Sequence, residues 1–197
     1  MIQLLLIATG FLNKLNGGLC AIGRTLGVFA IAAMVVAILI QVFFRYILNN
    51  ALPWPDEAAR FLMLWMTGFM APTAFRRGGF VAIDTFPSML PRLVAGFLNL
   101  FILIICLGVL VVSLQIGWKE VHGLGGRFAS ASLYLPTSFS FDSWFRLPRS
   151  WMMWSLVIGL GMLVLVNIEL MLRQIIGLTS KADKLPPIAH SETQGAV

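Results

Sequence analysis

Four long apolar runs, separated by short polar connections, make up most of the chain. Each run is close to the roughly 20 residues that an α-helix needs to cross the hydrocarbon core of a bilayer. The pattern predicts an all-α integral membrane protein with four transmembrane helices, over about 26–46, 56–75, 93–118 and 151–172. Residues 1–178 should form a single membrane domain, and residues 179–197 a flexible cytoplasmic tail without an apolar pattern.

Two further segments have mixed apolar and polar character. Residues 2–19 are apolar but short, which favours an N-terminal amphipathic helix lying in the membrane interface, with Asn13, Lys14 and Asn16 on its wet side. Residues 120–150 interleave glycines, aromatics and arginines. This composition predicts a periplasmic surface segment between the third and fourth spans, which contacts lipid headgroups or a protein partner.

The connection between the first two spans is the most structured turn in the sequence. Trp54 lies between Pro53 and Pro55, and Pro55 suits the first position of a helix because its missing N–H would be unpaired there. Asp56 and Glu57 follow and complement the positive end of that helix. Charges therefore occur where the chain should leave the hydrocarbon, which indicates a membrane hairpin.

Polar and small residues within the spans suggest helix packing. Pro72 should kink the second span and free a carbonyl that a neighbouring helix satisfies. Gly159 and Gly161 should permit close helix approach. Glu169 is a candidate functional residue as an intramembrane acid, but it lies four residues before Arg173, which predicts a pair at the membrane interface.

The composition fits a membrane protein better than a soluble one. Hydrophobic residues make up 59% of the chain and charged residues 11%, against about 25% charged in soluble domains. The formal net charge of +6 comes from basic residues dispersed at helix ends. Membrane lipids are therefore the expected partner of these charges, and a nucleic acid is not.

The sequence carries no recognisable catalytic or cofactor chemistry. Cys20 and Cys106 have no nearby cysteine or histidine with which to bind a metal, and His122 and His190 lie outside the apolar runs. Paired intramembrane histidines, which a haem-binding bundle requires, are missing from the sequence. No nucleophile and base are paired in or beside the spans. We therefore expect a protein that is not an enzyme and has no cofactor.

The distribution of basic residues predicts the orientation in the membrane. With four spans, eight basic residues share the side of the termini and six share the other, where acidic residues accompany them. This bias places both termini in the cytoplasm by the positive-inside rule.

One stretch of about forty residues resembles a known family. The residues that carry the likeness are Phe44-Arg45-Tyr46, Leu48-Asn49, Leu52-Pro53-Trp54, Glu57, Arg60-Phe61, Trp65, Arg77-Gly78 and Ile83-Asp84. Their order and spacing are similar to those of the DctQ-like small membrane subunit of tripartite ATP-independent periplasmic (TRAP) transporters. One departure is Phe80, where the family often has a histidine.

The resemblance implies a non-catalytic small permease subunit in a bacterial inner membrane. In that family a large multi-span membrane subunit holds the sodium and substrate sites, and a periplasmic binding protein delivers carboxylate substrates. The small subunit braces the large one during secondary active transport. The alternative is a small autonomous transporter or channel that forms homo-oligomers.

The candidate partner-interface residues come from the same stretch. Arg45, Glu57 and Arg60 should form a charge cluster that fixes the first hairpin and docks onto the large subunit. Aromatic side chains, Trp54 and Trp65 among them, could shield this cluster from water. The full set is Arg45, Trp54, Glu57, Arg60, Trp65, Arg77 and Asp84.

Overall fold

A computed structural model describes residues 2–50, 52–78, 91–136 and 144–178. The long helices in these residues are α1 (Ile2–Tyr46), α2 (Trp54–Arg76), α4 (Arg92–His122) and α6 (Ser150–Leu178), and α5 (Leu124–Arg127) is a single turn. Two antiparallel strands, β1 (Ala129–Pro136) and β2 (Trp144–Pro148), join α5 to α6.

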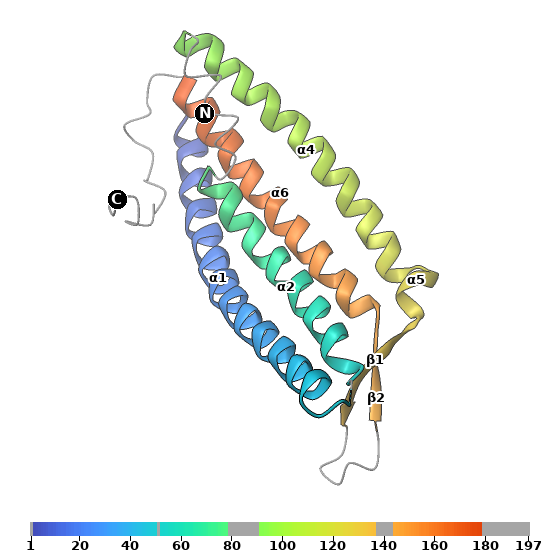
Figure 1. The fold of residues 1–197 in the computed structure, drawn as a ribbon. Coiled ribbons are helices and arrows are strands. Elements are labelled where there is room, and N and C mark those ends of the chain that lie inside the picture. Colours follow the sequence, from blue (N-terminus) through green and yellow to red (C-terminus); the bar gives the residue numbers. More distant parts are fainter. Residues whose placement is uncertain (1, 51, 79–90, 137–143, 179–197) are drawn as a thin grey trace, which may run out of the picture.

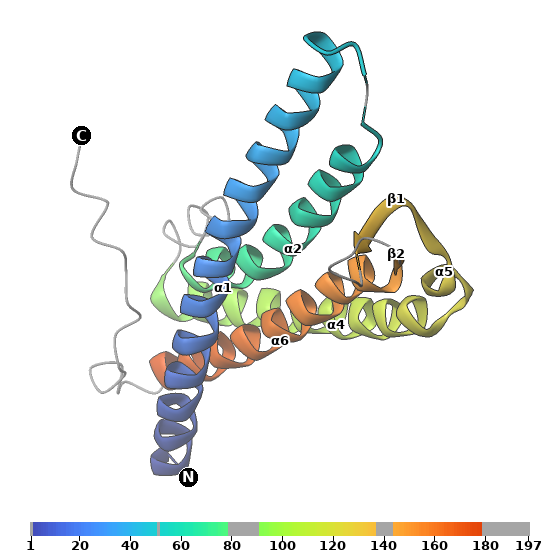
Figure 2. The same ribbon diagram turned by 90° about the horizontal axis from the view of Figure 1, so that it is seen from below.

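The helices pack in the order α1, α2, α6, α4 (Figure 1). α2 lies between α1 and α6, and α6 lies between α2 and α4, while α1 also contacts α6. Figure 2 shows the pair α1 and α2 inclined to the pair α4 and α6. Because each helix covers only part of its neighbour, large apolar side chains remain exposed along α1 and α4.

Three described helices are long and apolar enough to cross a membrane: Leu5–Tyr46, Val94–His122 and Ser150–Leu178. The helix α2, with 23 residues, is about 35 Å long and so has sufficient length. It has a lower hydropathy because charged residues occupy both of its ends, among them Asp56, Glu57 and Arg76. The structure thus fits a membrane protein, and a membrane crossing by α2 remains a prediction.

The N-terminal segment does not form a separate helix. α1 is continuous over 45 residues, about 68 Å, which is more than twice the hydrocarbon thickness. Two of its glycines permit close packing on α2: a Cβ on Gly23 would lie 3.0 Å from the Phe69 carbonyl oxygen, and one on Gly27 2.8 Å from Met70 Cε. The predicted wet side is also wrong, since Asn16 is buried and Asn13 half-buried, whereas Lys14 is exposed.

The segment between α4 and α6 contains a β-hairpin that the all-α prediction missed. Tyr134 pairs with Arg146 across the strands, and the guanidinium carbon of Arg146 lies 5.0 Å from the Tyr134 ring centroid. Leu147 faces inward and is 5% exposed. Cross-strand contacts of this kind stabilise a hairpin, and the strands lie beside the first turns of α2 and α6.

Glycines make a close backbone contact between α2 and α6. Pro72 lies inside α2 and has no N–H, so the carbonyl of Gly68, one turn earlier, loses its helical donor. This carbonyl faces α6, where a Cβ on Gly159 would lie only 2.8 Å from its oxygen. Only glycine leaves room for this approach, so the expectation for Gly159 is confirmed. Gly161 plays no such part, because no atom lies within 4 Å of its Cβ position.

We expect Gly159→Ala to destabilise the protein by about 1–3 kcal/mol, because its methyl group would overpack the backbone contact. Thermal unfolding of the detergent-solubilised chain would show this as a lower midpoint. Gly161→Ala is the matched control: its methyl group enters open space, and alanine favours the helix. Equal midpoints for the two variants would show that the contact with Gly68 is unimportant.

Candidate functional site

Three helices meet at a buried charged cluster that we call the Glu169 cluster. It consists of Asn13 and Asn16 from α1, Arg76 from α2, and Glu169 and Arg173 from α6. Glu169 is fully buried and Arg76 is 8% exposed. Glu169 lies nine residues before the end of α6, about 14 Å along the helix axis. The cluster is therefore inside the bundle, near the end at which α2 and α6 terminate.

Both oxygens of the Glu169 carboxylate accept charge-assisted hydrogen bonds. Arg76 binds in the bidentate manner, donating from Nε to Oε2 at 3.0 Å and from Nη2 to Oε1 at 2.9 Å. Arg173 donates from Nε to Oε1 at 3.0 Å. Asn16 Nδ2 donates to Oε2 at 2.7 Å and to the Leu165 carbonyl at 3.2 Å. Bidentate pairing of this kind is both strong and geometrically specific.

Asn13 connects the two arginines from the side of α1. Its Oδ1 accepts from Arg76 Nη2 at 2.6 Å and from Arg173 Nη2 at 2.9 Å. Its backbone carbonyl accepts a further bond from Arg76 Nη2 at 3.0 Å. One amide side chain thus bridges α2 and α6, so α1 participates without adding a charge.

The hydrogen bonding of the cluster suits a structural role better than a catalytic one. Burying a carboxylate is costly unless it is paired and its remaining lone pairs are hydrogen-bonded. Here four donating groups on three residues meet that requirement. A carboxylate so engaged has little capacity to accept a substrate proton. In the part of the chain that the structure describes, no group of three or more His, Cys, Asp or Glu side chains could bind a metal ion.

The sequence prediction for Glu169 was correct in one respect. The pairing with Arg173 is confirmed by an N–O distance of 3.0 Å. The side chain is not solvated, because Glu169 has no exposed surface, and its location at the membrane interface stays a prediction. Sequence reasoning did not anticipate the roles of Asn13, Asn16 and Arg76. The available signal was the position of the two asparagines three residues apart, on one face of a helix.

The residues expected at the first hairpin lie at the opposite end of α2. Arg45 and Arg60 are exposed, Glu57 is half-buried in the first turn of α2, and Arg45 lies 5.8 Å from the Tyr46 ring centroid. Trp54 is 39% exposed. The charge cluster of Arg45, Glu57 and Arg60 stays a prediction.

The remaining expected residues lie apart from that hairpin end. Trp65 packs on Phe69, with ring centroids 5.2 Å apart, and its buried Nε1 has no hydrogen-bond partner in the described structure. Arg77 follows the last turn of α2, beside the Glu169 cluster. Asp84 lies outside the described residues.

We expect Glu169→Gln to destabilise the protein by roughly 3–5 kcal/mol, because it leaves Arg76 and Arg173 buried without a counter-charge. Thermal unfolding in detergent measures the effect, with Glu120→Gln, an exposed acid on α4, as control. Adding Arg76→Met to Glu169→Gln should cost less than the sum of the two changes, because they remove one shared interaction. Additive costs would show that the pair is energetically uncoupled.

The comparison with protein families agrees with the resemblance seen in the sequence. No individual curated protein matches the chain. A family model for the DctQ component of tripartite ATP-independent periplasmic transporters matches residues 34–177. The match extends from α1 to the end of α6 and includes three members of the Glu169 cluster, Arg76, Glu169 and Arg173. The chain therefore belongs to the DctQ family of TRAP-transporter membrane components.

Proposed function

We propose that this protein is the non-transporting small permease subunit of a TRAP-type system and that it braces a large membrane subunit. The large subunit then contains the sodium and substrate sites, and a periplasmic binding protein delivers a carboxylate. The family match supports the class of complex. Sodium coupling, carboxylate substrates and the bracing role are our proposals, and they follow the resemblance.

The observation that carries the proposal is that the buried charged side chains pair with each other. In the described part of the chain, the buried charged side chains are Arg76 and Glu169, and they bind each other. A carrier for anions places charged groups or helix ends where a substrate can reach them. Here the buried charge instead joins three helices, which favours a rigid supporting subunit.

The exposed apolar surface also supports a bracing role. None of the residues in the most apolar stretch of α4 is buried by the rest of the chain. Large side chains such as Phe97, Phe101 and Val109 are more than half exposed. This surface is available both to lipid and to the large subunit, and a rigid helix layer would widen the static part of the complex.

We place the protein in a bacterial inner membrane with four spans and both termini in the cytoplasm. The eight-to-six distribution of basic residues supports this orientation. In spheroplasts of a Cys20→Ala, Cys106→Ala background, an impermeant maleimide should label Arg127→Cys but not Lys181→Cys. The opposite labelling would invert the topology.

Transport assays in liposomes test the proposed role. The chain alone should move none of a panel of radiolabelled carboxylates, with or without a sodium gradient. Liposomes that also contain the large subunit should take up the cognate substrate when the loaded binding protein and a sodium gradient are present. Sodium-dependent uptake by the isolated chain would instead establish the autonomous transporter.

We further propose that Arg45 and Glu57 contribute to docking with the large subunit. A charge that loses its partner at a dehydrated interface is strongly unfavourable, so Arg45→Met and Glu57→Gln should each reduce co-purification severalfold. The double variant should be milder than the sum of the two. Lys119→Met is the control, since Lys119 is exposed on α4. Full yield with both single variants would leave the hairpin end as an ordinary solvated rim.

A further inference from the structure

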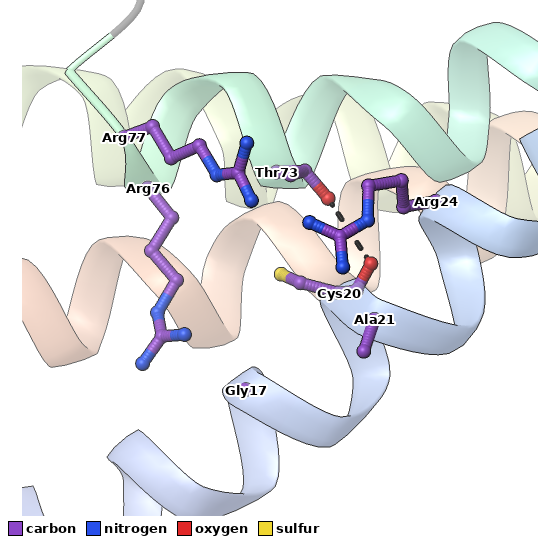
Figure 3. Close-up of a pocket in the computed structure, with 7 residues that line it drawn as sticks. All are labelled: Gly17, Cys20, Ala21, Arg24, Thr73, Arg76 and Arg77. Atoms are coloured by element: carbon purple, nitrogen blue, oxygen red, sulfur yellow. Dashed lines mark hydrogen bonds between the residues drawn. The ribbon is translucent and has the colours of Figure 1, made fainter. Parts of the chain in front are cut away.

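A pocket lined by three arginines lies between α1 and α2, next to the Glu169 cluster. Its volume is about 160 Å³, and its lining includes Gly17, Cys20 and Arg24 from α1, Thr73 and Arg76 from α2, and Arg77, which follows α2. Figure 3 shows the side chains of Arg24 and Arg77 extending toward each other from the two helices. The Thr73 hydroxyl closes one side by donating to the Cys20 carbonyl at 3.4 Å.

Among the described residues that line the pocket, the charged side chains are all arginines. Neither Arg24 nor Arg77 forms an ion pair within the described part of the chain. Arg76 engages Glu169 and Asn13 through Nε and Nη2. Its Nη1 takes no part in those bonds and lies 3.6 Å from the position of a Cβ on Gly17, in the pocket wall. Three arginines from two sides therefore line one cavity.

The position of Arg24 along α1 indicates where the pocket lies relative to a bilayer. Arg24 is 22 residues before Tyr46, the last residue of α1, and this distance corresponds to about 33 Å of helix. That length matches the hydrocarbon thickness of roughly 30 Å. If Tyr46 is at one surface, Arg24 is at the level of the opposite headgroups, as are the last residues of α2.

The surface beside the pocket is apolar and exposed. Val28, Ile31 and Val35 of α1 are 56%, 39% and 46% exposed. They follow Arg24 by about one, two and three turns on the same face of the helix, toward Tyr46, so an acyl chain could follow this surface from a headgroup placed in the pocket. A free anion, which has no acyl chain, would not contact this apolar surface.

We propose that this pocket binds the phosphate group of an anionic membrane phospholipid. Arginine forms bidentate bonds to phosphate oxygens, and Arg24, Arg77 and the Nη1 of Arg76 supply donors from different directions. The buried ion pair with Glu169 fixes Arg76, so one donor is preorganised before the lipid arrives. This inference does not depend on the transport role.

Lipid retention by the purified full chain tests the proposal. Native mass spectrometry should show that phosphatidylglycerol is retained in preference to phosphatidylcholine. The double variant Arg24→Gln, Arg77→Gln should weaken phosphatidylglycerol binding by roughly 30-fold, given the attraction of each basic residue to anionic lipid. The control variant Arg127→Gln, Arg149→Gln removes two exposed charges that flank the β-hairpin. It should change phosphatidylglycerol binding by less than about twofold.

Several results would overturn the proposal. One is equal retention of the two lipids, and another is an equal loss in the control variant. Full displacement of the lipid by millimolar inorganic phosphate would reveal a site for free anions. Unchanged lipid retention in the Arg24, Arg77 variant, with loss of the large subunit on co-purification, would assign the pocket to a carboxylate of that partner. The unfolding midpoint of the lipid-free variant serves as the folding control. We expect it to be no lower than that of the parent chain, which would exclude misfolding.

Discussion

Glu169 imposes the strongest physical requirement on this fold, because its carboxylate is removed from both water and lipid. A buried acid needs opposite charge and enough donors to occupy its oxygens. Arg173 comes from the same helix, but Arg76 and Asn16 come from two others. α2 must therefore end beside α6, and α1 must extend far enough to bring Asn16 to the same place. One charge thereby determines how three helices meet.

A second contact fixes the orientation of α2 on α6. Gly68 meets Gly159 at one level, and Arg76 meets Glu169 at another. These points are eight residues apart on α2 and ten on α6, or about 12 and 15 Å. A polar contact fixes the register, and a close backbone contact fixes the separation. Two helices joined at two levels resist both sliding and rotation, which a supporting subunit requires.

The sequence was sufficient for most of the long helices but not for the β-hairpin or the Glu169 cluster. Apolar runs located the starts of α2, α4 and α6 to within two residues but ended up to six residues before the helices do, and the four-residue spacing gave the Glu169–Arg173 pair. The contacts of Glu169 with Arg76 and Asn16 span 93 and 153 residues, which no local pattern reveals. Hydropathy also treats every polar residue as solvated, so it placed Asn13 and Asn16 on a wet face. The β-hairpin escaped notice because its strands are short and irregular in register.

Arg76 connects the structural cluster to the proposed lipid pocket. Its Nε and Nη2 bind Glu169 and Asn13, and its Nη1 lies beside Gly17 in the lining of the pocket. The guanidinium is planar and rigid, so the direction of Nη1 is set by the bonds that the other two nitrogens make. A lipid bound at Nη1 would in turn restrict Arg76 and favour the same packing of α1, α2 and α6. Because binding to the folded state alone stabilises it, the membrane itself would help to stabilise the helix layer that we propose as a brace.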